Sequence, residues 1–116
     1  MDFNKIFLSG RIIRDVEFYS TVHDRQILKF NIEVIDRKVH NIFTIVIFGD
    51  LAEKAKKELK KDKRVFVEGR LRYSQFRTRT GAFRSRIEVI ADKIFLIDEG
   101  GFLDGKPKST VQEIST

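Results

Sequence analysis

Hydrophobic and polar residues alternate with a period of two in several stretches of the chain. Residues 5–13 and 28–35 each have one apolar face and one polar or mixed face. Residues 41–48 are rich in β-branched and aromatic side chains and are apolar on both faces. Residues 64–76 and 84–97 are two further patterns of this kind, and no proline interrupts them. Such alternation is typical of half-buried β-strands, so the pattern predicts five strands.

Two other segments lie between these strands. Residues 14–26 are polar and are predicted to connect the first two strands. Only one stretch has a helical period, because apolar residues recur at every fourth position from Leu51 to Leu59. Asp50 and Glu53 have the spacing of a capping box. The helix is therefore predicted to begin at Asp50, directly after the third strand.

The predicted order is three strands, one helix and two strands joined as a long hairpin. One isolated helix cannot build parallel βαβ units, so we expect an all-β, antiparallel fold. This order is that of the five-stranded OB-fold barrel with one short helix between strands 3 and 4, whereas an SH3-like barrel would lack that helix. From residue 98 the chain becomes rich in Gly, Ser and Thr. We expect an OB-fold domain over residues 1–97 and a flexible tail over residues 98–116.

The composition of the chain excludes several classes of function. The 116 residues include 23 Lys and Arg against 17 Asp and Glu, and this net charge of +6 favours polyanionic partners such as nucleic acid. There is no cysteine, which removes disulfide scaffolds and thiolate metal sites. No apolar run is long enough to span a membrane, and the start of the chain lacks the features of a signal peptide. We therefore expect a cytoplasmic protein.

No pattern typical of catalysis occurs in the sequence. The only histidines, His23 and His40, lie in predicted turns and have no neighbouring metal ligands. Residues 101–106 resemble a phosphate-binding loop only faintly, because the spacing is one residue short and no Ser or Thr follows the lysine. We predict no catalytic residues, no metal, no cofactor and no enzyme activity.

Residues 70–86 form the most informative segment. Its seventeen residues hold six arginines and three aromatic residues and no acidic residue. Arginine neutralises phosphates while aromatic rings stack on unpaired bases of any identity, so the segment is typical of single-stranded nucleic-acid binding. The alternative is a hairpin whose arginines only keep it soluble, with the aromatic rings packed beneath it. The candidate DNA-binding residues here are Arg70, Arg72, Tyr73, Phe76, Arg77, Arg79, Phe83, Arg84 and Arg86.

The third strand contributes a further candidate. If Phe43 and its alternate neighbours point into the barrel, Ile42, Val46 and Phe48 point outward, and Phe48 becomes a candidate DNA-binding residue. Because both faces are apolar, the opposite register satisfies the pattern as well. In an isolated barrel the outer face would leave Ile42 and Val46 exposed, which predicts that other subunits cover it.

Four segments in series resemble the bacterial single-stranded DNA-binding protein family. They are residues 4–11, 47–53, 67–72 and 81–89, and their order and spacing match the family over about residues 4–97. The resemblance implies an OB-fold, a homotetramer, binding of single-stranded DNA without sequence preference, and no catalysis. It further implies a role in DNA replication, recombination and repair in the nucleoid.

The resemblance also assigns roles to single residues. Phe48 and Phe76 match base-stacking positions of the family, and Arg84 and Arg86 fall on the basic end of the same hairpin. Ile42 stands where the family has a stacking Trp, and a second such Trp falls in a loop that is shorter here. The acidic C-terminal tip by which the family recruits replication and repair proteins is not found in residues 112–116.

Two alternatives remain open at this stage. The first is a primosomal OB-fold protein, a dimer that links single-stranded DNA to a replication helicase. The second is a nuclease, which would require carboxylates or histidines gathered around a metal. The mass of the assembly distinguishes the dimer from the tetramer, and a cleavage assay with Mg²⁺ tests for the nuclease.

Overall fold

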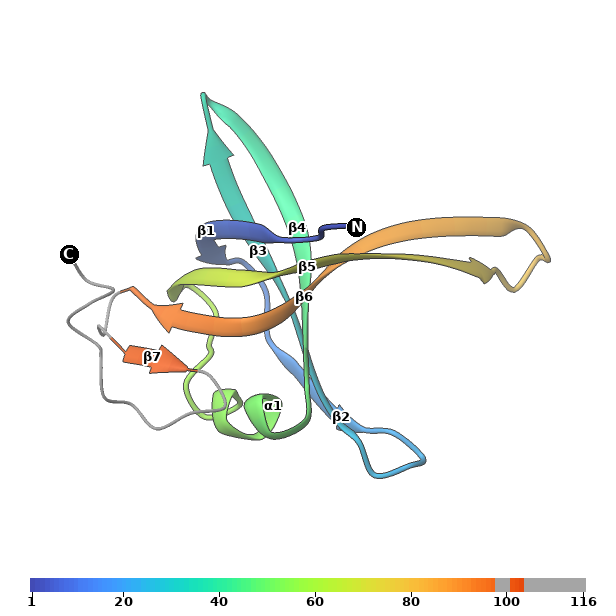
Figure 1. Cartoon of the computed structure of the whole chain (residues 1–116), viewed down its shortest axis with the longest axis horizontal. Coiled ribbons are helices and arrows are strands. Elements are labelled where there is room, and N and C mark those ends of the chain that lie inside the picture. The colour runs from blue at the N-terminus through green and yellow to red at the C-terminus, as the bar shows by residue number, and fades with distance from the viewer. Residues whose placement is uncertain (98–100, 104–116) are drawn as a thin grey trace.

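The computed structural model describes residues 1–97 and 101–103, and its strands form one sheet that closes into a barrel (Figure 1). The elements in chain order are β1 (Ile6–Ile12), β2 (Glu17–Ser20), β3 (Gln26–Asp36), β4 (Val39–Phe48), α1 (Gly49–Ala55), β5 (Arg64–Arg77), β6 (Phe83–Leu96) and β7 (Gly101–Leu103).

Five of these strands form the barrel. The hydrogen-bonded order β1-β5-β6-β4-β3 closes because β1 also pairs with β3, at Arg11 opposite Glu33 and at Ile12 opposite Ile32. All neighbours in the barrel are antiparallel except β4 and β6, which are parallel. With α1 between the third and fourth barrel strands, this is the predicted OB-fold, so the predicted fold class is confirmed.

The core consists of the apolar faces that the sequence pattern predicts. Ile12 of β1 and Phe30 of β3 are buried inside the barrel. Ile45 and Ile47 of β4 are fully buried in the same cluster, and Phe43 packs against it. The third predicted strand therefore has the register that turns Phe48 and its alternate neighbours outward.

Close packing of the backbone at Gly10 helps the barrel to close. A Cβ atom at Gly10 would lie 2.4 Å from the carbonyl oxygen of Glu33 on β3, a distance that a side chain cannot tolerate. Gly69 on β5 approaches the carbonyl oxygen of Ile90 on β6 in the same way. The pairing of β5 with β6 shifts by one residue beside Gly69, which is typical of a β-bulge.

Three details of the predicted elements are wrong. Residues 14–26 are not only a connection, because β2 lies within them and pairs with the start of β3. This strand is four residues long and lies at the edge of the sheet, and Phe18 is its only partly buried side chain, so the alternation is too short to be recognised. The helix begins at Gly49 rather than Asp50, and no side chain caps it. It is also only seven residues long, although Leu59 beyond its end is buried as the pattern predicted.

Two hairpins extend beyond the barrel. The β5–β6 hairpin is the longer one and projects away from the barrel, and the β3–β4 hairpin projects in another direction (Figure 1). A third turn, between β2 and β3, lies near the end of β4 where Phe48 is placed. Within the described ranges no helix is long and apolar enough to cross a membrane.

The predicted flexible tail over residues 98–116 lies outside the described residues except at β7. This strand pairs antiparallel with β6, and Phe102 lies opposite Phe95. The pairing continues the sheet beyond the point at which β4 leaves β6.

Candidate nucleic-acid interface

Phe48 is the last residue of β4 and lies on the outer side of the barrel. The guanidinium groups of two arginines lie above its ring. The guanidinium carbon of Arg25, from the β2–β3 turn, lies 4.4 Å from the ring centroid, and that of Arg72, from β5, lies 5.4 Å away. Both distances are typical of cation–π contacts. The ring therefore lies on the outer face next to two positive charges, as its outward register implies.

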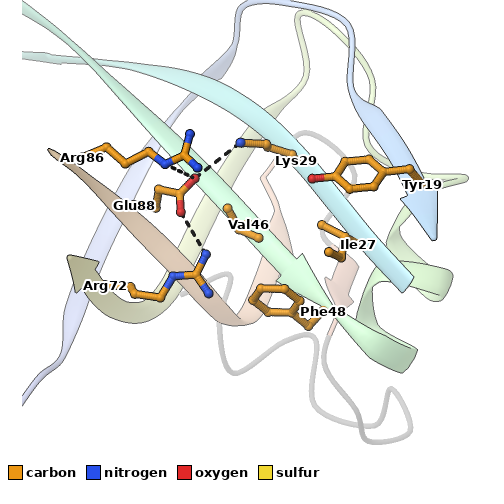
Figure 2. A pocket seen from close by; sticks show the side chains of 8 residues that line it. All are labelled: Tyr19, Ile27, Lys29, Val46, Phe48, Arg72, Arg86 and Glu88. Atoms are coloured by element: carbon orange, nitrogen blue, oxygen red, sulfur yellow. Dashed lines mark hydrogen bonds and ion pairs between the residues drawn. The ribbon is translucent and has the colours of Figure 1, made fainter. Parts of the chain in front are cut away.

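An open pocket surrounds this ring on the outer face (Figure 2). Val46 forms part of the apolar floor and is only 3% exposed, because side chains of its own chain cover it. The expectation that Val46 is exposed in an isolated barrel is therefore wrong, whereas Ile42 on the same face is 55% exposed. The residues that line the pocket are Tyr19, Ile27, Lys29, Val46, Phe48, Arg72, Arg86 and Glu88.

The outer face continues from the pocket along the β5–β6 hairpin. Residues directly opposite each other in paired strands point to the same side of a sheet. Arg72 lies opposite Glu88, and Phe76 lies opposite Arg84, two alternations farther out. Arg86 lies between these pairs, with its guanidinium carbon 4.8 Å from the centroid of the Phe76 ring. Two aromatic rings with guanidinium groups above them thus lie along one face.

The other face of the hairpin carries three of the candidate residues. Tyr73 lies opposite Ile87, and Arg77 lies opposite Phe83, with the Arg77 guanidinium carbon 4.6 Å from the Phe83 ring centroid. Tyr73 is 61% exposed and Phe83 is 68% exposed. The structure therefore divides the candidates between the two faces of the hairpin and does not gather them into one site.

The two remaining arginines differ in their surroundings. Arg70 lies next to the barrel, where its guanidinium group is 2.5 Å from the Asp92 carboxylate in an ion pair. Arg79 lies in the exposed turn between β5 and β6, which Gly81 completes with a positive φ of 88°. Arg70 is thus held by an acidic partner, whereas Arg79 extends the positive charge to the tip.

Glu88 is the acidic residue of the pocket. Its carboxylate accepts a hydrogen bond from Arg72 at 2.9 Å and lies 3.5 Å from the Lys29 ammonium group and 3.9 Å from Nε of Arg86. Burial opposes ionisation of this carboxyl, but the hydrogen bond from Arg72 and the charges of Lys29, Arg86 and Arg72 outweigh burial and lower its pKa. Glu88 is therefore a carboxylate at neutral pH.

The sequence did not reveal every residue of this surface. Arg25 and Tyr19 come from the β2 region, which reads as a polar connection, and Lys29 lies on the polar face of β3. Alternation in 17–20 was the only available signal for β2, and it is too short to stand out. Glu88 follows the arginine-rich segment by two residues, and only the strand register shows that it faces Arg72.

The described residues of this surface do not include a set of side chains that could bind a metal ion. Among the described residues no cluster of three or more His, Asp or Glu side chains could hold a metal ion. His40 lies elsewhere, with Nδ1 3.0 Å from the Glu33 carboxylate. The hydrogen bond with His40, together with the charges of His40 and Arg11, lowers the pKa of Glu33.

Comparison with known proteins identifies a family that the chain matches. The profile of the Single-strand binding protein family matches residues 3–97. A protein named Single-stranded DNA-binding protein from Thermotoga maritima is 38% identical over 120 residues, which cover 96% of this chain and 81% of that protein. Proteins of the same name from Borreliella burgdorferi and Treponema pallidum are 34% and 31% identical, over 85% and 99% of this chain and 72% and 68% of those proteins.

Proposed function

Because the chain belongs to the single-strand binding protein family, we propose that it binds single-stranded DNA without sequence preference. It protects unpaired strands during replication, recombination and repair, in the cytoplasm at the nucleoid. The protein acts by binding alone, and no catalytic step is assigned to it.

One observation supports the proposal most strongly, namely the line of aromatic rings and guanidinium groups on the outer face. Phe48 and Phe76 supply ring faces, and each base stacked on such a ring contributes about 1–3 kcal/mol whatever its identity. Arg72, Arg84 and Arg86 lie beside these rings and supply positive charge for the phosphates. Stacking and phosphate neutralisation together give affinity for an unpaired strand without reading its sequence.

The predicted homotetramer is part of this proposal. Phe7 of β1 is 55% exposed, and its ring stacks on that of Phe66 at a centroid separation of 6.1 Å. Exposed neighbouring aromatic rings on an outer sheet face favour burial against another subunit. We expect light scattering without DNA to give four times the chain mass of 13.6 kDa. A mass of twice that value would instead favour the dimeric primosomal protein.

Titration of labelled oligonucleotides tests the binding itself. Oligo-dT, oligo-dC and a mixed-sequence strand of equal length should bind with similar affinity, because ring stacking does not depend on base identity. A duplex of the same length should bind much more weakly, since its bases are already stacked in pairs. Equal binding of duplex and single strand, or a strong preference for one sequence, would contradict the proposal.

A further inference from the structure

Glu88 stands apart from every other charged or polar residue in the part of the chain that the structure describes. It is the only one that is buried there, with 3% of its surface exposed, although it lies on the outer face of the sheet. Burial of a carboxylate is unfavourable unless charged and hydrogen-bonding partners compensate for the lost water. The position therefore requires partners, and the surrounding strands supply them.

Three cationic side chains from three strands surround the carboxylate (Figure 2). Lys29 comes from β3, Arg72 from β5 and Arg86 from β6, and each forms an ion pair with Glu88. Three positive charges at such short separations repel one another. A central anion allows them to lie together, and the Arg72 hydrogen bond at 2.9 Å also fixes the direction of that guanidinium group.

Two of these cations connect Glu88 to the aromatic rings of the interface. Arg72 lies above the Phe48 ring, and Arg86 lies above the Phe76 ring. The order ring, guanidinium, carboxylate, guanidinium, ring thus runs from the end of β4 to the hairpin. Long arginine side chains have many rotamers, so an unrestrained guanidinium would lose entropy when it engages a phosphate or a base.

We propose that Glu88 is a positioning residue for DNA binding, which holds the guanidinium groups of Arg72 and Arg86 beside the two stacking rings. This proposal rests on the proposed function, because it concerns how the same surface binds a single strand. It has a consequence that simple charge attraction does not share. Loss of a negative charge at a DNA-binding surface should strengthen phosphate attraction, whereas loss of a positioning carboxylate should weaken binding.

The variant Glu88→Gln distinguishes these two effects, because it keeps the shape of the side chain and removes its charge. Its matched control is Glu33→Gln, which makes the same change in charge at a carboxylate that is paired with Arg11 and His40 and does not line the pocket around Glu88. We expect Glu88→Gln to weaken oligo-dT binding about fivefold to twentyfold, since two charge-assisted contacts lose their anion. Glu33→Gln should bind as tightly as the wild type or slightly more tightly.

Unchanged or tighter binding by Glu88→Gln would overturn the proposal. If the wild type itself failed to bind oligo-dT, the proposed function would fail as well, so the two failures are distinguishable. Folding of both variants is checked by circular dichroism, and the titrations are made well below their unfolding temperatures.

A measurement on the wild type covers the case in which Glu88→Gln does not fold. Restricted rotation of a guanidinium group gives separate NMR signals for its terminal N–H protons. We expect such signals for Arg72 both in the free protein and with saturating oligo-dT, because Glu88 holds this group throughout. Averaged signals in the complex would show that no fixed partner holds Arg72 there, and this result would overturn the proposal.

Discussion

On the outer face, aromatic rings lie next to the guanidinium groups of arginine side chains. Phe48 and Phe76 lie outside the core, and each has a guanidinium group within cation–π distance. Phe30, in contrast, lies in the middle of the barrel core. Rings of the same chemical type therefore lie on the outer face in two places and in the core in the third.

Truncation of Phe76 should separate binding from folding. We expect Phe76→Ala to lose about 1–3 kcal/mol of oligo-dT affinity, because one base-stacking ring is removed. Its melting temperature should stay close to that of the wild type, since Phe76 is 40% exposed. Phe30→Ala is the matched control and should cost about 3–5 kcal/mol of folding free energy. If Phe76→Ala destabilised the fold as much as Phe30→Ala, the ring would be structural.

The lowered pKa of Glu88 predicts how stability depends on pH. The folded protein holds this carboxylate ionised to lower pH than the unfolded chain does, where the ordinary value is 4.5. Its contribution to stability is therefore fully present above pH 4.5 and is lost as the pH falls through the lower pKa of the folded state.

Urea unfolding of the wild type and of Glu88→Gln measures this effect. The measurements run from pH 3 to pH 6, which is about one to two units on either side of the ordinary carboxyl pKa. The free energy by which the wild type exceeds the variant should be larger at the upper end of the range than at the lower end. A difference that stays constant with pH would show that Glu88 has the same pKa in both states.

The individual strands show how far the sequence determines the fold. Alternation in β1 and β3 identified their inner faces, because apolar or small residues recur there at every second position. Residues 41–48 of β4 are apolar on both faces, so only the structure shows which face of that strand points into the core. The same signal failed for β2, which is short and lies at the sheet edge. The start of α1 was wrong because the spacing of Asp50 and Glu53 imitates a cap that the backbone does not use.

The sequence also predicted the candidate site only in part. Composition alone marked the β5–β6 hairpin as a candidate binding element, and one of the two registers that residues 41–48 allow placed Phe48 outward. Which arginine faces which ring depends on cross-strand register, and this register includes a shift beside Gly69 that no local pattern shows. Hence only the structure shows that Phe76 and Tyr73 lie on opposite faces of the hairpin and that Glu88 faces Arg72.

The approach of β1 to β3 gives a prediction about the barrel itself. Gly10→Ala would place a Cβ atom 2.4 Å from the Glu33 carbonyl oxygen, so the two strands must separate locally. We expect a loss of about 1–3 kcal/mol of folding free energy, as is typical of overpacking. Ser9→Ala, at the exposed neighbouring position, is the control and should have little effect in the same urea unfolding experiment. Equal stability of the two variants would contradict this account of how the barrel closes.

The whole molecule carries a net charge of +6, and the arginines of the interface concentrate part of it on one surface. For single strands, log K falls with log salt by about 0.7 for each phosphate that the protein neutralises. If three or four arginines of each chain contact phosphates, the slope of log K against log salt should be about −2 to −3 per subunit. Fluorescence titrations with oligo-dT over a range of NaCl concentrations measure it, and a flat response would exclude phosphate neutralisation as the source of affinity.

The central claim is that a single strand runs along the outer face, over Phe48 and Phe76. Photocrosslinking tests it directly, because 5-iodouracil in an oligonucleotide reacts on irradiation with the aromatic side chain on which it stacks. We predict crosslinks at Phe48 and Phe76, located by mass spectrometry of the digested complex. Crosslinks confined to Tyr73 and Phe83, on the other face of the hairpin, would contradict the account.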